Sequence, residues 1–335
     1  MRTRNGVRTM NARTRRSLAL LAVLAGSVQA QTPVVLVPDD PADHASSPRP
    51  PAPAQPPPAA ALFDYDASLP LRFTVLGGQT QDNLRLVDAS FQGAPGSTVT
   101  CTCILPPNPT HAPAVLFLHS GNSSREEFIP EALALARRGI VCLLIDAPFA
   151  RPEATLYNPA VRGHDAAMYI RAVVDCRRAV DLLRARPDTD PTRIAFVGHS
   201  FGGYVGGILS GVEPRIRSFA LIAAFPSLAD AVRDRPALAP QRERLGPERV
   251  SAYIAEMRPL DAAPFVAAAR PLSLLLQFGS RDREVSADQA QRLTAAATGP
   301  TTVKTYLCGH ELNEPRAVAD RDDWLVSRFA LAADR

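Results

Sequence analysis

Ile194-Ala-Phe-Val-Gly-His-Ser-Phe-Gly-Gly203 is the most informative stretch of this sequence. An apolar run ends at Val197, and Gly198-x-Ser200-x-Gly202 follows it directly. This order predicts a buried strand, a sharp turn that carries the serine, and a helix that begins at the glycines. Such a turn strains the serine backbone and leaves no space for side chains beside it, so glycines are needed there. Ser200 is therefore the candidate nucleophile, and the positive end of the helix would lie beside any oxyanion that forms.

Apolar runs alternate with helical patterns on both sides of this segment. The runs cover residues 114–118, 140–145, 193–197, 216–223, 271–278 and 301–307. The main helical patterns cover residues 126–138, 165–186, 287–297 and 314–331. Strands that are apolar on both faces and alternate with helices predict a parallel sheet covered on both sides. Three short strands, at 71–76, 84–91 and 98–105, precede them with Gly-Gly and Gly-Ala-Pro-Gly turns between. We therefore expect an α/β fold with a mostly parallel, doubly wound sheet and antiparallel N-terminal strands.

A serine needs a base to be nucleophilic at neutral pH, and the sequence has six histidines. His310 stands after the last predicted strand, on a loop preceded by glycine, and follows the serine in the chain. That position fits the order serine, acid, histidine that is known for this strand-turn-helix arrangement. Of the other five, His44 is in a proline-rich stretch and His111 is in a polar loop. His119 is at a strand end, His164 is at a helix start, and His199 is next to the serine. His310 is the predicted general base.

The acid that orients the histidine is expected after the strand at 271–278. Gly279-Ser-Arg-Asp282 follows this strand and supplies a turn and a carboxylate. Asp288 falls on the next helix, Asp261 precedes the strand, and Asp146 is better explained as a structural hydrogen-bond partner. Asp282 is therefore the predicted acid.

Two backbone N–H groups are required to hold an oxyanion. Phe201 follows the nucleophile and supplies the first. The loop after residues 114–118 supplies the second from Gly121, with Ser120 and Asn122 as open alternatives. His119 at the start of this loop is expected to hold the loop in place and not to transfer protons.

Composition limits the function classes. The chain has 335 residues and a formal charge of +4, but residues 1–30 contain six arginines and no acid. The remainder has 31 basic and 33 acidic residues, so nothing indicates a nucleic-acid partner. The basic stretch, the apolar run at 17–26 and Val28-Gln-Ala30 are typical of a signal peptide, and that run is too short to span a bilayer. We expect an exported protein that is cleaved near Ala30 and has no stable membrane insertion.

Three parts of the chain are predicted. A signal peptide occupies residues 1–30, and a linker with ten prolines between Pro33 and Pro58 occupies residues 31–61. The catalytic domain covers residues 62–335. Within it, residues 226–269 interrupt the alternation with a helical stretch that is rich in Arg, Pro and Ala, and they form a candidate lid.

Cysteine usage indicates no metal site. The five cysteines are an odd number, so at least one thiol is unpaired within the chain. Most of them are expected to be small buried hydrophobic residues. No Cys/His spacing resembles a metal site, and we expect neither a metal nor a cofactor. The oligomeric state is not predicted.

The sequence resembles the α/β-hydrolases, and within them the group of dienelactone hydrolases and acetyl xylan esterases. The resemblance covers residues 62–333 and rests on these segments: Phe63-Asp-Tyr-Asp-Ala67, Pro113-Ala-Val-Leu-Phe-Leu-His119, Asp190-Pro-Thr-Arg-Ile194, Gly198-His-Ser-Phe-Gly-Gly203, Gly279-Ser-Arg-Asp282 and Gly309-His310. One departure is His119-Ser120, where the family has His-Gly in the oxyanion loop. Dienelactone hydrolases use a cysteine nucleophile, so their substrate is not implied for this chain.

The resemblance implies hydrolysis of a small-molecule carboxylic ester through an acyl-enzyme. Three alternatives remain on the same fold: a prolyl-oligopeptidase-like peptidase, an acyl-thioesterase and an acyltransferase. A non-catalytic binding protein would be expected to have lost a member of the triad, and all three are present.

Overall fold

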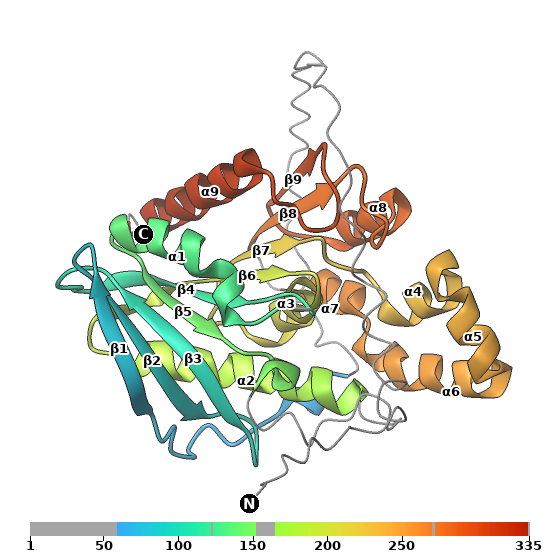
Figure 1. Ribbon diagram of the computed structural model, residues 1–335, viewed down its shortest axis with the longest axis horizontal. Helices are drawn as coiled ribbons and strands as arrows, with labels where there is room; N and C mark the ends of the chain where they lie inside the picture. The colour runs from blue at the N-terminus through green and yellow to red at the C-terminus, as the bar shows by residue number, and fades with distance from the viewer. Residues whose placement is uncertain (1–58, 122, 152–164, 270–271, 334–335) are drawn as a thin grey trace, which may run out of the picture.

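The computed structural model describes residues 59–121, 123–151, 165–269 and 272–333 (Figure 1). The predicted signal peptide and almost all of the predicted linker lie outside the described residues, as do Asn122 and His164. The first described element is a short 3-10 helix, η2 (Ala60–Phe63), which begins just before the predicted start of the domain at residue 62. None of the helices in the described ranges is both long and apolar enough to cross a bilayer.

The strands of the described residues form one nine-stranded sheet in the order β1-β2-β3-β5-β4-β6-β7-β8-β9. The pairs β1–β2, β2–β3 and β3–β5 are antiparallel, and every pair from β5 to β9 is parallel. This arrangement confirms the predicted mostly parallel sheet with an antiparallel start. The strands are β1 (Thr74–Gln81), β2 (Leu84–Gln92), β3 (Thr98–Leu105), β4 (Ala112–Leu118), β5 (Val141–Ile145), β6 (Thr189–His199), β7 (Ser218–Ile222), β8 (Ser273–Gly279) and β9 (Thr301–Tyr306).

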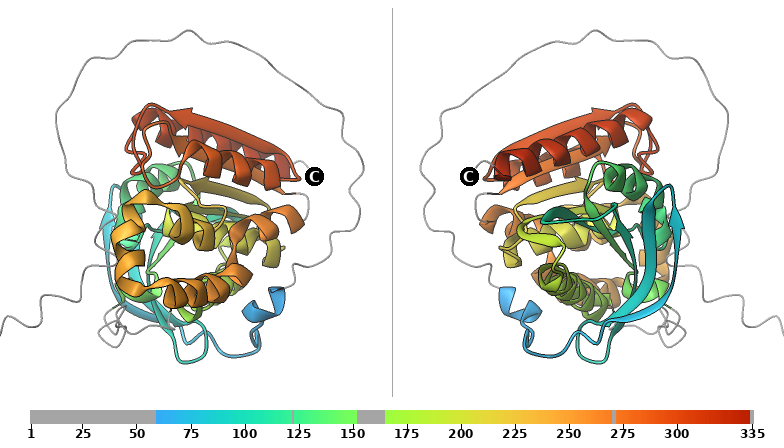
Figure 2. Two further views of the ribbon diagram at one scale, coloured as in Figure 1. Left: turned by 90° about the vertical axis from the view of Figure 1, so that its right-hand side faces the viewer. Right: turned by 90° about the vertical axis from the view of Figure 1, so that its left-hand side faces the viewer.

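Helices cover both faces of the sheet (Figures 1 and 2). The helices α1 and α9 lie together on one face, while α2 and α3 lie on the other, with α7 packed on α3 and α8 on α7. The apolar strands between them are buried on both faces, which explains their continuous apolar runs. These helices are α1 (Ile129–Arg137), α2 (Asp165–Ala185), α3 (Phe201–Val212), α7 (Ala262–Ala268), α8 (Ala287–Ala296) and α9 (Pro315–Ala333).

The chain reverses its direction of travel across the sheet next to β4. It goes from β4 to β5 on one side and then crosses to β6 on the other side of β4. In open α/β sheets, ligands bind outside the carboxyl ends of the strands at such a switch point. The loop after β4 and the turn after β6 both lie there, and they contain Gly121 and Ser200. The topology therefore brings the predicted oxyanion loop to the predicted nucleophile.

The first strand differs from the prediction at residues 71–76. In the structure β1 starts at Thr74 and continues through the Gly-Gly pair to Gln81, with a register shift between Val75 and Gly77. The turn comes instead at Asp82 and Asn83, whose φ values are 50° and 64°. Two residues with positive φ make the tight hairpin turn whose twist matches the paired strands, and Asp and Asn tolerate this conformation.

The candidate lid is shorter than predicted. Residues 226–269 form the helices α4 (Leu228–Asp234), α5 (Ala239–Leu245), α6 (Pro247–Met257) and α7, with short 3-10 helices between them. However, α7 belongs to the helix layer, because Ala262, Phe265 and Val266 are buried and α7 packs closely on α3. Only α4 to α6 extend beyond the layers, at the right of Figure 1. The candidate lid therefore narrows to residues 228–260.

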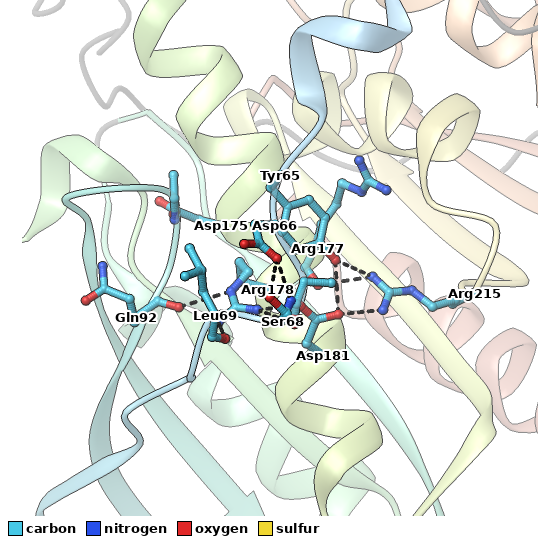
Figure 3. Close-up of polar contacts among 12 residues, drawn as sticks. Tyr65, Asp66, Ser68, Leu69, Gln92, Asp175, Arg177, Arg178, Asp181 and Arg215 are labelled. Atoms are coloured by element: carbon cyan, nitrogen blue, oxygen red, sulfur yellow. Dashed lines mark hydrogen bonds and ion pairs between the residues drawn. The ribbon is translucent and has the colours of Figure 1, made fainter.

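The segment that follows η2 is held on α2 by a group of buried charges (Figure 3). The Arg178 side chain is only 2% exposed and donates to the Leu69 carbonyl at 2.7 Å and to Asp181 at 3.0 Å. The Arg177 guanidinium lies 4.7 Å from the centre of the Tyr65 ring. The Tyr65 hydroxyl in turn donates to Asp181 at 3.0 Å. These contacts attach the N-terminal segment to the middle of α2.

Replacing Arg178 with alanine should lower the free energy of unfolding by about 3 kcal/mol, because carbonyl groups that accept from a buried guanidinium lose their partner. A matched control is Arg137→Ala, which removes an exposed ion pair with Asp82. Exposed pairs contribute between zero and about 1 kcal/mol. Urea unfolding of both variants tests this, and equal losses of stability would contradict the role assigned to Arg178.

The cysteines behave largely as expected. All five are free thiols in the structure. Cys101, Cys103, Cys142 and Cys176 are buried, and Cys308 is partly exposed. Burial raises the pKa of the Cys142 thiol well above its usual value, so this side chain is an inert part of the core.

Candidate active site

Ser200 lies in the turn between β6 and α3, as the sequence predicts. Its backbone has φ 51° and ψ −104°, an unfavourable conformation for a residue with a side chain. The turn is tightly packed: a Cβ on Gly198 would lie 2.3 Å from the Gly202 carbonyl oxygen, and a Cβ on Gly202 would lie 2.0 Å from that of Leu118. Only glycine fits at either position. The strain and the packing present the serine side chain at the start of a helix, where an anion is stabilised.

His310 and Asp282 come from the loops after β9 and β8. The His310 Nε2 atom lies 2.7 Å from Ser200 Oγ, and its Nδ1 atom lies 2.8 Å from Asp282 Oδ2. The three predicted residues are thus joined in one chain of hydrogen bonds, although they are 110 and 28 positions apart. A carboxylate accepts the Nδ1 proton, so Nε2 is left free to accept the serine proton.

The orientation of Asp282 is itself held by its own loop. Its Oδ1 atom accepts the backbone N–H groups of Glu284 at 2.7 Å and Val285 at 3.0 Å, while Oδ2 faces His310. The side chain is 1% exposed. A buried carboxylate with all these donors is fixed in both position and rotation.

The loop after β4 approaches the start of α3. A Cβ built on Gly121 would lie 4.0 Å from the Cβ of Phe201, so the two predicted oxyanion residues are neighbours. The Ser120 N–H is already donated to Glu127 at 2.9 Å, which removes Ser120 from the alternatives. Asn122 lies outside the described residues. Phe201 and Gly121 remain the candidate donors, and Asn122 stays an open alternative to Gly121.

His119 and Asp146 have structural roles, in agreement with the expectations. The buried His119 ring accepts the Ala147 N–H at Nε2 and donates from Nδ1 to the Ser120 carbonyl. Burial lowers the pKa of His119, consistent with a neutral ring that has one donor and one acceptor. Asp146 accepts from the Thr100 hydroxyl at 2.6 Å and forms an ion pair with Arg125.

Glu127 and His199 were not recognised from the sequence as parts of the site. Glu127 lies on the 3-10 helix η3 (Arg125–Phe128), and its Oε1 atom is 2.6 Å from His199 Nδ1. The other ring nitrogen of His199 is 2.9 Å from the backbone carbonyl of His310. A carboxylate just before an apolar helix signals only a helix start, so no local pattern could have identified this contact.

Aromatic side chains surround the start of α3. The ring of Phe201 meets Phe149 edge-on at 5.0 Å and stacks on Tyr169 at 5.1 Å, measured between ring centres. Phe225 lies 6.1 Å from the His310 ring on the same measure. The candidate site therefore has aromatic, apolar surroundings, as small-molecule sites commonly do.

The candidate lid is linked to the loop of the acid. Arg235, which follows α4, forms an ion pair with Glu284, two positions after Asp282, and both side chains are nearly buried. Asp230 on α4 pairs with Arg292 on α8 at 3.0 Å. These ion pairs thus connect the helices of the candidate lid to the domain next to the site.

Within the described ranges, no group of three or more His, Cys, Asp or Glu side chains is arranged to hold a metal ion. The groups that the candidate site brings together are a serine hydroxyl, an imidazole, a carboxylate and backbone N–H groups.

Comparisons with known proteins identify the family and the fold. Residues 115–326 match the model of the family described as "Alpha/beta hydrolase family". No curated protein matched the chain. Among solved structures, an acetyl xylan esterase from Paenibacillus sp. R4 aligns with a TM-score of 0.68 and 21% identity, over 80% of this chain and 92% of that one. Acetyl xylan esterase 1 from Thermoanaerobacterium sp. JW/SL YS485 aligns with a TM-score of 0.68 and 16% identity, over 81% of this chain and 92% of that one. A puromycin-hydrolyzing peptidase from Mycobacterium tuberculosis aligns with a TM-score of 0.59 and 19% identity, over 75% of this chain but only 39% of that one. At these identities the likeness demonstrates a common fold.

Proposed function

Because the chain belongs to the alpha/beta hydrolase family, we propose that it is a serine esterase whose catalytic triad is Ser200, His310 and Asp282. The observation that supports this most directly is the continuous chain of hydrogen bonds from Asp282 through His310 to Ser200 Oγ. The acetyl xylan esterases with the same fold favour an ester over an amide as the substrate class.

The proposed reaction has two acyl-transfer steps. His310 Nε2 takes the proton of the Ser200 hydroxyl while Oγ attacks the ester carbonyl carbon. The carbonyl oxygen becomes an oxyanion, held by the N–H groups of Phe201 and Gly121. The C–O bond to the alcohol breaks, and His310 gives its proton to the departing alcohol oxygen. Water then attacks the acyl-enzyme with His310 again as base, which releases the carboxylic acid and restores Ser200. Asp282 keeps Nδ1 protonated throughout.

A panel of substrates tests the proposal. We expect turnover of chromogenic esters with acyl chains from acetyl to octanoyl to exceed that of peptide anilides by at least about a hundredfold, because an amine leaves only when fully protonated by the general acid. Acyl-thioesters and an added alcohol acceptor should be measured beside them. Faster cleavage of anilides would indicate a peptidase, faster cleavage of thioesters a thioesterase, and preferential transfer to the alcohol an acyltransferase.

A further inference from the structure

One carboxylate contacts two separate parts of the candidate site. The Oε2 atom of Glu127 accepts both the backbone N–H of Ser120 at 2.9 Å and its hydroxyl at 2.8 Å. The Oε1 atom faces His199 Nδ1 at 2.6 Å. Ser120 directly precedes the proposed oxyanion donor Gly121, and His199 directly precedes the nucleophile. A single side chain on η3 therefore connects the end of β4 with the end of β6.

His199 extends this connection to the general base. Its Nε2 atom lies 2.9 Å from the backbone carbonyl of His310, and the two rings are 5.6 Å apart between centres. This carbonyl belongs to the loop after β9, which carries the imidazole to Ser200. The path from Glu127 thus ends on the residue that must accept the serine proton.

The partners of His199 determine its protonation. A carbonyl oxygen and an ionised carboxylate can only accept hydrogen bonds, and each faces one ring nitrogen. Both nitrogens must then carry a proton, so His199 is an imidazolium that is paired with the Glu127 carboxylate.

The surroundings agree with this assignment. Burial acts to lower the pKa of His199, but the hydrogen bond and charge of Glu127, with smaller effects of the His310 carbonyl and Glu311, raise it overall. Burial acts to raise the pKa of Glu127, but His199 and Ser120 together lower it to about 2. The His199 side chain is only 5% exposed and that of Glu127 is 21% exposed, so the imidazolium end of the pair is shielded from water.

We propose that Glu127 and His199 are positioning residues, which fix the oxyanion loop and the backbone of His310 in the geometry that the reaction requires. This inference rests on the proposed esterase function. The reason is geometric: oxyanion stabilisation and proton transfer both depend on alignment to a fraction of an ångström, and a misplacement of about 1 Å can cost a hundredfold in rate. The two groups that must be aligned come from loops after different strands, and this pair connects them.

The test compares Glu127→Gln with Glu126→Gln in the full chain. Glu126 is the exposed neighbour on the same helical turn and serves as the matched control. Glutamine keeps the size of the side chain and can still accept from Ser120, but it has no charge to hold the His199 imidazolium.

For Glu127→Gln we expect kcat to fall by about tenfold to a hundredfold with KM changed less than about threefold, because the aligned groups act mainly in the transition state. The rate of Ser200 labelling by a fluorophosphonate should fall in parallel. The Glu126→Gln control should stay within about twofold of wild type on all three measures.

Glu127→Asp provides the conservative variant and decides the question if Glu127→Gln does not fold. It keeps the charge but is shorter by one methylene group, so we expect an intermediate kcat. A merely structural pair would lower the melting temperature while kcat per fluorophosphonate-titrated site stayed at the wild-type value, and that result would overturn the proposal. A wild-type protein that neither hydrolyses esters nor reacts with a fluorophosphonate would overturn the proposed function and this inference with it. A reactive wild type with unchanged kcat in the Glu127 variants would overturn this inference alone.

Discussion

The Ser200→Ala variant should lose covalent labelling by a fluorophosphonate altogether, and its ester turnover should fall by about 10⁴ to 10⁶-fold. Only a serine that is deprotonated by an aligned base attacks such a phosphorus, and His310 Nε2 lies 2.7 Å from this hydroxyl. The alanine methyl group fits where the serine side chain was, so the fold is expected to remain.

Mass spectrometry of the labelled protein and the kinetics of an activated ester provide the measurements. Ser251→Ala, at an exposed position on α6, is the control and should be labelled at the wild-type rate. Labelling of Ser200→Ala at the wild-type rate would show that the nucleophile is another residue.

Asp282→Asn should reduce turnover by at least about a hundredfold, and by up to about 10⁴, the loss that this change causes in a serine protease. The structure shows why the effect should be specific. In the wild-type protein the N–H groups of Glu284 and Val285 donate to Asp282 Oδ1. The Oδ1 atom of the asparagine can accept the same two hydrogen bonds. Its amide NH₂ then replaces Oδ2 and donates to His310 Nδ1. This favours the tautomer with the proton on Nε2, which cannot accept the proton of Ser200.

Two other aspartates provide controls for this prediction. Asp288 is 75% exposed in its side chain, and its amide variant should cost less than about threefold in turnover. Asp261 stands just before α7 but makes no side-chain capping hydrogen bond, and burial raises the pKa of its carboxyl group, so a neutral amide is expected to be tolerated there as well. Circular dichroism and melting curves must accompany the kinetics. Near-normal turnover of Asp282→Asn, together with an essential carboxylate elsewhere, would show that the acid had been misplaced.

Much of the fold was predictable because it depends on local patterns. Continuous apolar runs alternating with amphipathic stretches require strands covered on both faces, and the structure confirms the parallel sheet. The errors fell where two local signals compete. The Gly77-Gly78 pair reads as a turn, but pairing with β2 extends the strand through it, and Asp82-Asn83 makes the turn instead. The helix α7 reads as part of an insertion, but its small and apolar side chains pack on α3.

The sequence by itself indicated the strand-turn-helix at Ser200, because an apolar run, the Gly-x-Ser-x-Gly pattern and a helix start follow one another in it. The crowding at Gly198 comes from Gly202, four positions away, whereas that at Gly202 comes from the Leu118 carbonyl of β4, which only the tertiary structure brings there. The sequence also indicated His310 and Asp282, because chain order and strand ends restrict where a base and an acid can stand. Only the tertiary structure decided that Ser120 donates its N–H to Glu127 and that Glu127 reaches His199 and, through it, His310. The Glu127 and His199 positions are 72 residues apart, and those of His199 and His310 are 111 apart. Hydrogen bonds of this kind form only where loops that follow separate strands come together at one edge of the sheet. Contacts between residues so far apart in the sequence produce no local sequence pattern from which they could be predicted.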